Sequence, residues 1–456
     1  MSFARMTARM KSIKANRRWG VTAALMMAVT LSGCGLFGDD DPRSTPTVGN
    51  REPILSRIEA GARVDPSLAT IAVVLPQPQV NAEWSQAGGT ASKSYGHLAI
   101  GASPREIWTA QIAGSNPRRR LAAAPVIGGG SLFAVDTEGV VHAFSADNGA
   151  RRWTYRLPVA SDIRSSAFGG GVSFSNGRVY ATNGVGEVVA LDAANGSLVW
   201  NVKPAGPLRG APTLAFNSVY VMTQDNQIYA LNAADGAVVW QASGSSGEAG
   251  LFGVAAPAAG QGTIIAGYSS GELSAYRYEN GRELWLDALS RTSISTEVGA
   301  LTDVDADPII DSGRVYALGR GGRMAAYELV TGQRIWELNL AGISTPAVSG
   351  EWIFTLTSDS RLLNIARSTG RVRWMTQLQQ WRDAEDREGQ VNWTGPVLAG
   401  NRLWVASSRG EVRTVDVQTG IASLFRDLDE DISLPPVVAN QTLYILDDSG
   451  RIHAFR

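Results

Sequence analysis

The stretch Ala190-Leu191-Asp192-Ala193-Ala194-Asn195-Gly196-Ser197-Leu198-Val199-Trp200 decides the fold, because its pattern recurs along most of the chain. Within it, a glycine precedes a tryptophan by four residues. The same spacing is found at Gly149/Trp153, Gly196/Trp200, Gly236/Trp240, Gly281/Trp285, Gly332/Trp336 and Gly370/Trp374. Trp108 extends this column upstream, and Gly420 extends it downstream with Leu424 in the tryptophan position. The tryptophans lie 38 to 51 residues apart, a period that indicates repetition of one supersecondary unit.

Each repeat contains the pattern of a β-hairpin followed by one more strand. Two runs rich in β-branched and aromatic residues precede the glycine, as in 219–222 and 228–231, and a short polar turn separates them. Phe168 begins one unit, and a proline followed by small or apolar residues begins the others: Pro125, Pro212, Pro257, Pro308, Pro346, Pro396 and Pro436. The sequence therefore predicts eight units of four short strands.

A ring of such units is an all-β, eight-bladed β-propeller of four-stranded antiparallel blades, and a solenoid is the less favoured alternative. The last unit ends at Arg456 after its third strand, whereas 107–110 provides a spare fourth strand. We expect this N-terminal strand to complete the last blade, because closure removes two exposed edges. Large indole rings bury much area, so we expect an inter-blade structural role for the column Trp108, Trp153, Trp200, Trp240, Trp285, Trp336 and Trp374.

The N-terminus has the features of a secretory signal. Residues 1–18 carry six basic residues and no acidic one, and the apolar run 19–31 ends in Leu31-Ser32-Gly33-Cys34. This ending resembles a bacterial lipobox, which implies cleavage before Cys34 and acylation of that residue. An ordinary signal peptide with a chance cysteine, or an uncleaved anchor, are the alternatives. Gly35 in place of an aspartate favours the outer membrane, with the protein lipid-anchored and facing the periplasm.

The predicted domains are a lipoprotein signal peptide (1–33), a lipidated Cys34 with a tether and N-terminal extension (34–83), and the propeller (84–456). Residues 71–75 form either a short strand or a segment lying on the main domain. The net charge of −1 becomes −7 once the basic signal is removed. That charge gives no electrostatic case for binding nucleic acid, and membrane contact needs only the N-terminal lipid.

The composition leaves little for catalysis. One cysteine and three histidines exclude a disulfide framework and leave no recognisable metal spacing, nucleophile triad or phosphate-binding loop. His142 and His453 share one repeat position, which other units fill with unrelated residues, so a strand surface is the favoured interpretation. We therefore expect no catalytic residues, no metal site and no cofactor.

The stretch quoted first resembles the tryptophan-docking motif of pyrroloquinoline-quinone propellers. One class with this motif comprises quinoprotein dehydrogenases, and those that oxidise alcohols commonly carry an adjacent cysteine pair and an acidic calcium site. Here the only cysteine is Cys34, and the long inserted loops of those enzymes are missing. A periplasmic quinone-dependent dehydrogenase-like propeller remains the alternative function.

The second class is the BamB family of outer-membrane assembly lipoproteins, which the chain resembles through the signal, the lipobox and all eight units. Leu208-Arg209-Gly210 and Asp303-Val304-Asp305 also match stretches that the family uses for docking. The resemblance implies a non-catalytic scaffold of the BAM complex that binds the periplasmic POTRA domains of BamA, other BAM subunits and unfolded outer-membrane protein clients. It assigns partner binding to Leu208, Arg209, Asp303 and Asp305.

The repeat register supports this assignment, since Arg209 and Asp305 each lie three residues before a strand-starting proline. That offset predicts that both lie at the inner rim of one face; an intramolecular rim interaction or solvated loop charges are the alternatives. The longer connections 241–254, 286–306 and 375–395 should open on the same face, with a short helix at 381–388. Two features depart from the family pattern: the N-terminal extension 35–83, and Leu424, which suggests a looser seventh blade.

Overall fold

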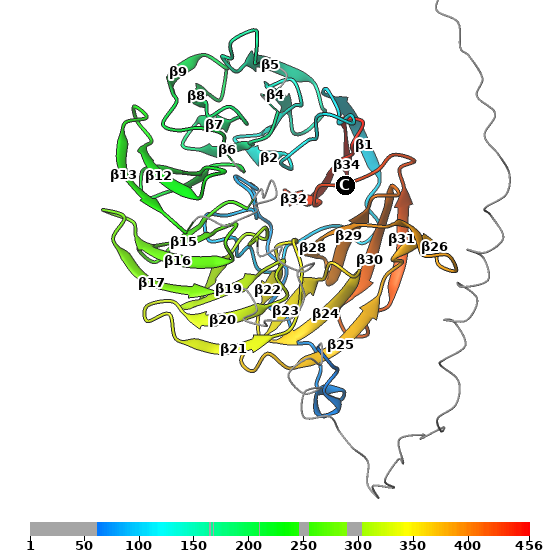
Figure 1. Cartoon of the computed structure of the whole chain (residues 1–456). Helices are drawn as coiled ribbons and strands as arrows, with labels where there is room; N and C mark the ends of the chain where they lie inside the picture. Colours follow the sequence, from blue (N-terminus) through cyan, green and yellow to red (C-terminus); the bar gives the residue numbers. More distant parts are fainter. Residues whose placement is uncertain (1–61, 164–165, 167, 209, 246–254, 290–302) are drawn as a thin grey trace, which may run out of the picture. The chain divides into compact units, whose positions relative to one another are not determined.

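The computed structural model describes residues 62–163, 166, 168–208, 210–245, 255–289 and 303–456, and these contain eight four-stranded antiparallel sheets. Figure 1 shows the sheets following one another around a ring in the order of the sequence. The predicted all-β, eight-bladed propeller is confirmed. A two-stranded hairpin and one 3-10 turn, η1 (Pro66–Leu68), complete the described elements.

The blades are numbered in chain order, and each strand runs antiparallel to its neighbour in the blade. Blades 1 and 2 comprise β2 (Val126–Gly128), β3 (Ser131–Val135), β4 (Val140–Ser145), β5 (Arg151–Arg156), and β6 (Val172–Ser175), β7 (Arg178–Thr182), β8 (Val188–Asp192), β9 (Leu198–Val202). Blades 3 and 4 comprise β10 (Thr213–Ala215), β11 (Ser218–Met222), β12 (Gln227–Asn232), β13 (Val238–Ser243), and β14 (Ala258–Gly260), β15 (Thr263–Gly267), β16 (Glu272–Arg277), β17 (Glu283–Ala288). Blades 5 and 6 comprise β18 (Ile309–Asp311), β19 (Arg314–Leu318), β20 (Met324–Glu328), β21 (Arg334–Leu338), and β22 (Ala347–Ser349), β23 (Trp352–Leu356), β24 (Arg361–Ala366), β25 (Val372–Gln377). Blades 7 and 8 comprise β28 (Trp393–Ala399), β29 (Arg402–Ser407), β30 (Glu411–Asp416), β31 (Ala422–Asp427), and β32 (Val437–Ala439), β33 (Thr442–Leu446), β34 (Arg451–Phe455), β1 (Glu106–Gln111).

The ring closes in blade 8, where β1 pairs antiparallel with β34. The backbone of Arg105 and that of Arg456 exchange two hydrogen bonds of 2.8 and 2.9 Å at the end of this pair. The predicted closure by an N-terminal strand is therefore observed. In blade 8 the third strand (β34) and the fourth strand (β1) come from opposite ends of the propeller sequence. In the other blades a turn joins the third strand to the fourth.

Burial follows the position of a strand within its blade. The second and third strands are buried on both faces, because the neighbouring blades cover them, and they are almost continuously apolar. The fourth strands lie at the outer rim and are more exposed; in β9, β13 and β17 the tryptophan is the one buried residue of the strand. A β-bulge directly before the tryptophan in these strands turns the indole inward.

Each tryptophan of the column joins its blade to the next one. The indole N–H donates to a backbone carbonyl near the turn before the next blade's fourth strand, at 2.8 to 3.1 Å in all seven cases. The ring lies over the glycine of that turn: a Cβ on Gly281, for example, would lie 2.5 Å from Cε3 of Trp240, and the φ of Gly281 is +69°. Only glycine fits this close approach with such a φ.

Blade 7 uses Phe425 in place of the tryptophan. The bulge is displaced in β31, so that Leu424 pairs with Arg413 and points outward with 58% of its surface exposed. Phe425 points inward instead and makes edge contacts with Trp404 and Phe455, at centroid distances of 5.0 and 5.5 Å. The expected placement of Leu424 in the inter-blade column is thus wrong by one residue. Blade 8 has no turn before its fourth strand, and so no glycine on which an indole could lie.

Candidate partner-docking face

One face of the propeller carries the connections between successive blades, and we call it the connection face. It includes the described parts of the connections 203–212, 289–308 and 378–392, which join fourth strands to the first strands of the next blades. The antiparallel order places the turns between second and third strands on the same face, and an isolated bridge between Leu208 and Thr223 joins a connection to one such turn. The residues predicted to dock a partner all belong to these connections.

Leu208 does not project into solvent. Only 1% of its surface is exposed, and it packs with Trp200, Val221 and Leu231 in the core between blades 2 and 3. Arg209, which follows it, lies outside the described residues. The Leu208 side chain therefore fixes the base of the connection rather than presenting a surface on it.

The acidic pair lies in the connection to blade 5. Asp303 is fully buried, and its backbone carbonyl accepts a hydrogen bond from the Arg320 N–H at 2.9 Å. Asp305 is 9% exposed, and its carboxylate lies 3.4 Å from the Arg320 guanidinium. Of the three predicted site residues that the structure describes, Leu208, Asp303 and Asp305, Asp305 lines a central cavity.

That cavity, of about 390 Å³, opens at the centre of the connection face. Its lining is mostly apolar and comes mainly from the connections into blades 1, 5, 6, 7 and 8 and from the start of β28; it includes the large side chains of Trp393, Ile343 and Leu434. Asp305 and Asp307 provide the acidic groups of the wall, and Trp84 and Tyr95 come from the segment before the first blade. The alternating Asp303, Asp305 and Asp307 were visible in the sequence, but no sequence signal placed Trp84 or Tyr95 here.

Residues 79–100 run through the central channel and bind the inner strands of most blades (blue in Figure 1). Their backbone atoms make hydrogen bonds with residues in or next to the first strands of several blades: Asn440, Ile127, Phe174, Ala259, Ile310 and Gly400. The side chain of Gln86 adds a two-way bond to the Leu214 backbone, at 2.8 and 3.2 Å. The sequence assigned the propeller to residues 84–456 without foreseeing that its first part fills the channel.

An ionisable residue, Lys93, is buried in the channel. Lys93 is 1% exposed, and its Nζ donates to the Ala87 carbonyl and to Oγ1 of Thr213, at 2.9 and 3.1 Å. Burial lowers the pKa of Lys93 to about 8, against the opposing effect of the nearby Asp307 carboxylate. Burial likewise raises the pKa of Asp307, whose Oδ1 accepts from the Ala256 N–H at 2.8 Å. The bond to Thr213 holds the channel segment against the first strand of blade 3, and the Asp307 carboxylate joins the connections into blades 4 and 5.

Residues 62–78, which were expected in the tether, lie along blades 6 and 7 instead. Val64 forms a parallel bridge with Val372, and the Asp65 N–H donates to the Val372 carbonyl at 2.7 Å. Val73 is buried and exchanges two hydrogen bonds with the Gln418 side chain. The run 71–75 is therefore not a strand but a segment lying on the main domain. Cys34 lies outside the described residues.

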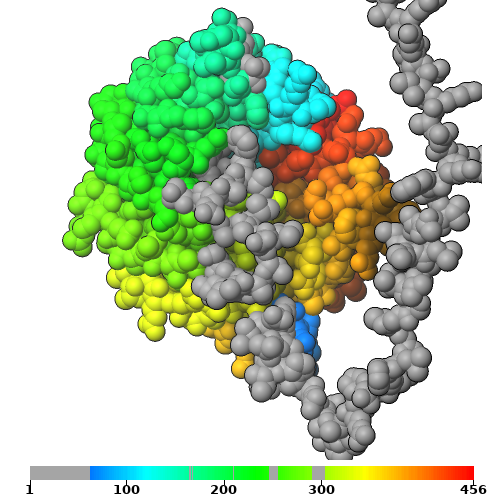
Figure 2. All heavy atoms as spheres, in the orientation of Figure 1, coloured from blue at the N-terminus to red at the C-terminus, as the bar shows by residue number. Residues whose placement is uncertain are grey.

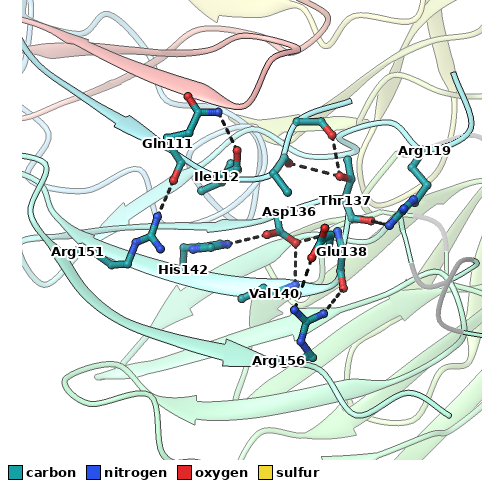
Figure 3. Close-up of polar contacts among 12 residues, drawn as sticks. Gln111, Ile112, Arg119, Asp136, Thr137, Glu138, Val140, His142, Arg151 and Arg156 are labelled. Carbon is teal, nitrogen blue, oxygen red and sulfur yellow. Dashed lines mark hydrogen bonds and ion pairs between the residues drawn. The ribbon is translucent and has the colours of Figure 1, made fainter. Parts of the chain in front are cut away.

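The two repeat histidines are buried rather than on a strand surface. Nε2 of His142 lies 2.8 Å from the Asp136 carboxylate, whose other oxygen accepts from the backbone of Glu138 and Val140 (Figure 3). Nε2 of His453 contacts Asp447 in the same way at 3.1 Å, and its Nδ1 lies 3.1 Å from Glu106 on β1. Each pair clamps the turn between second and third strands, a structural arrangement that the sequence interpretation missed.

The short helix expected at 381–388 is not formed; these residues belong to a hairpin of β26 (Trp381–Asp383) and β27 (Glu388–Gln390). No cluster of three or more potential metal-binding side chains occurs in the described part of the chain. Nor does any helix within the described ranges have the length and apolar character needed to span a membrane. Figure 2 shows all heavy atoms in the same orientation, with the parts of the propeller following one another in the colours of Figure 1.

Comparison with solved structures supports the fold. The BamB structure from Moraxella catarrhalis superposes with a TM-score of 0.65 at 20% identity, covering 77% of this chain and 99% of that one. A europium-containing methanol dehydrogenase gives a TM-score of 0.64 at 14% identity, covering 80% of this chain and 89% of that one. At these identities the likeness concerns the propeller alone and does not separate an assembly factor from a dehydrogenase.

Proteins related in sequence distinguish between an assembly factor and a dehydrogenase. A family model described as "Outer membrane protein assembly factor BamB" matches residues 137–376. The protein of that name from Salmonella typhimurium is 32% identical, and the alignment covers 77% of this chain and 88% of the relative. The one from Escherichia coli is 30% identical, and the alignment covers 72% of this chain and 83% of the relative. One from Yersinia pestis is 29% identical over 77% of this chain. The chain therefore belongs to the BamB family of outer-membrane protein assembly factors.

Proposed function

We propose that this BamB-family chain acts as a non-catalytic scaffold of the BAM complex, held at the periplasmic side of the outer membrane by a lipid on Cys34. The observation that carries the proposal is the match to assembly factors along 83–88% of two relatives' lengths. The signal and lipobox in the sequence support the location.

The connection face is the surface we assign to BamA, through its POTRA domains. Arg209 and Asp305 are the residues we expect to meet the partner, since Asp305 borders the central cavity. Leu208 and Asp303 are buried, so we expect them to support the docking surface indirectly, by fixing the backbone of the two connections. Opposite charges on such a rim favour a correctly oriented encounter more than they add raw affinity.

Charge reversal tests this assignment. Arg209→Glu and Asp305→Arg, made separately, should each reduce recovery of BamA with the tagged chain by about tenfold or more, because each places a like charge against the partner. Arg282→Glu is the matched control: Arg282 is exposed in the turn before β17, on the opposite face. Unchanged recovery with folded Arg209→Glu and Asp305→Arg proteins would remove these residues from the interface.

The alternative function, a quinone-dependent dehydrogenase, is favoured only by the shared propeller architecture. It predicts a specific change: reconstitution with pyrroloquinoline quinone and calcium should produce bound-quinone absorbance and dye reduction with an alcohol. The scaffold proposal predicts neither signal under conditions in which BamA is recovered.

A further inference from the structure

The fourth strands at the outer rim differ in whether they carry ionisable residues, a difference that the fold does not require. The fourth strand of every blade is an edge strand, with one side of its backbone unpaired by the blade. Proteins commonly protect such edges with charged side chains. Six of the eight carry at least one ionisable residue: β1, β5, β17, β21, β25 and β31. In contrast, β9 (Leu-Val-Trp-Asn-Val) and β13 (Val-Val-Trp-Gln-Ala-Ser) carry none.

The two uncharged edges also expose their apolar side chains. Leu198 and Val199 at the start of β9 are 49% and 42% exposed, and Val238 and Val239 at the start of β13 are both 51% exposed. The strands belong to adjacent blades, since the Trp200 indole of blade 2 donates to the Ala233 carbonyl of blade 3. Figure 1 shows them next to each other on the rim of the ring. They form one neutral, apolar stretch of rim, which we call the blade 2–3 edge (Leu198, Val199, Val238 and Val239).

Blade 6 shows what occupation of such an edge looks like. Val372 has the same register as Leu198 and Val238, as the first residue of its fourth strand and opposite the third strand. Residues Val64 and Asp65 of the same chain add to that edge in parallel, through a backbone bond of 2.7 Å. Val372 is consequently only 1% exposed, compared with 49% and 51% for its two counterparts. An extended segment thus binds this type of edge by backbone pairing and covers the apolar residue at its start.

We propose that the blade 2–3 edge binds extended, unfolded strands of outer-membrane β-barrel proteins by strand addition. This inference rests on the proposed function, which supplies the class of client. Barrel strands are about ten residues long, and on their lipid-facing side they carry uncharged apolar residues at every second position. Such a strand can satisfy the free backbone groups of β9 or β13 and cover the exposed apolar side chains without burying a charge. On the other unoccupied rims, charged residues oppose the same apolar contact.

The connection that follows β9 leads directly to Leu208, so the client edge adjoins the surface assigned to BamA. A strand held on the blade 2–3 edge would therefore lie beside the insertase rather than on the far side of the ring. The two surfaces remain separable, because the edge lies on the rim and the docking residues lie in the connections.

The test places into blades 2 and 3 the charges that blades 1 and 4 already have. Arg151 and Glu283 occupy the register of Leu198 and Val238, so Leu198→Arg with Val238→Glu should be compatible with the fold. Leu286→Arg is the control, because Leu286 is 52% exposed on β17, an edge that already carries charges. The probe is a fluorescein-labelled peptide of about ten residues in which valine and leucine alternate with neutral polar residues. Binding is measured by fluorescence anisotropy on the full chain, with circular dichroism as the folding check.

We expect the double variant to weaken peptide binding by about tenfold or more, and Leu286→Arg to leave it within about twofold. BamA recovery, measured on the same proteins, should be unchanged in all three, which separates this inference from the proposed function. Equal peptide binding by wild type and the folded double variant would overturn the inference. So would no binding by wild type that still recovers BamA, or a concentration-dependent dimer of wild type that the double variant abolishes, since the edge would then serve a second copy.

Discussion

Single residues carry the joints between blades, and Trp240 is representative. It is 6% exposed, donates to the Tyr278 carbonyl of blade 4 at 2.8 Å, and lies against Gly281. Trp240→Ala should reduce the free energy of unfolding by about 3–5 kcal/mol, because it removes a large buried ring and leaves a cavity. Chemical denaturation measures the change, with the exposed neighbour Val239→Ala as the control. An unchanged midpoint for Trp240→Ala would contradict the inter-blade role.

His453 makes the closure of the ring sensitive to pH. Burial opposes the imidazolium, but hydrogen bonds to Asp447 and Glu106 prevail and raise the pKa of His453 above 6.5. A raised pKa contributes stability that is complete below the unfolded value and is lost as the pH rises through the folded value. The stability advantage of wild type over His453→Gln should therefore shrink from about pH 6 to pH 8. Urea unfolding at several pH values measures it, and an advantage that grows over this range would contradict the sign.

Seven of the eight joints could be predicted from the sequence at the level of single residues. Tryptophan is rare and bulky, and its spacing from glycine repeats, so the column was visible without any structure. The burial of Leu208 and Asp303 could not be predicted, because alternation within a short connection depends on which neighbouring blade covers it. The histidine–carboxylate clamps were missed for a similar reason: only two of the eight blades use them.

At the scale of the element, blade 7 shows how a strand adapts to ring closure. Its neighbour, blade 8, is completed by β1 and offers no glycine turn, so β31 shifts its bulge by one residue and inserts Phe425. The repeat alignment assumed the same register in every unit and therefore selected Leu424. The structure does not support a looser seventh blade on this ground, since Phe425 contacts aromatic rings on both sides.

Two adjacent residues of β31 provide the test. Phe425→Ala should destabilise the protein by about 2–4 kcal/mol, because it removes a packed ring between blades 7 and 8. Leu424→Ala should change stability by less than about 0.5 kcal/mol, because most of that side chain is in solvent. Thermal and urea unfolding of both variants measure the difference. The reverse order of effects would show that the original column assignment was correct.

At the scale of the whole molecule, residues 62–100 convert an open ring into a filled one. The outer part lies along blades 6 and 7, and the inner part binds the first strands around the channel. The sequence could not predict this, because the segment has no repeat and its partners are backbone groups distributed over many blades. The ring itself was predictable because eight similar units each specify the same local structure.

Removal of the channel segment should expose the inner edges. In a chain lacking residues 62–100, the amides of Ile127, Ala259, Ile310 and Asn440 lose their carbonyl partners and should exchange with solvent much faster. The melting temperature should also fall, since Trp84 and Leu98 leave the core that surrounds blade 8. Hydrogen exchange measured by mass spectrometry compares the two proteins, with peptides from β19 and β29 as internal references. Unchanged exchange at the first strands would contradict the channel assignment.

We propose that this BamB-family propeller serves the outer-membrane assembly machinery as a non-catalytic scaffold. Affinity purification of the tagged full chain from detergent-solubilised envelope, followed by mass spectrometry, tests it most directly. We expect recovery of BamA and other BAM subunits with the wild-type protein, and loss of BamA from the Arg209→Glu and Asp305→Arg proteins. Recovery of wild-type protein without BamA, from membranes in which BamA is present and intact, would contradict it.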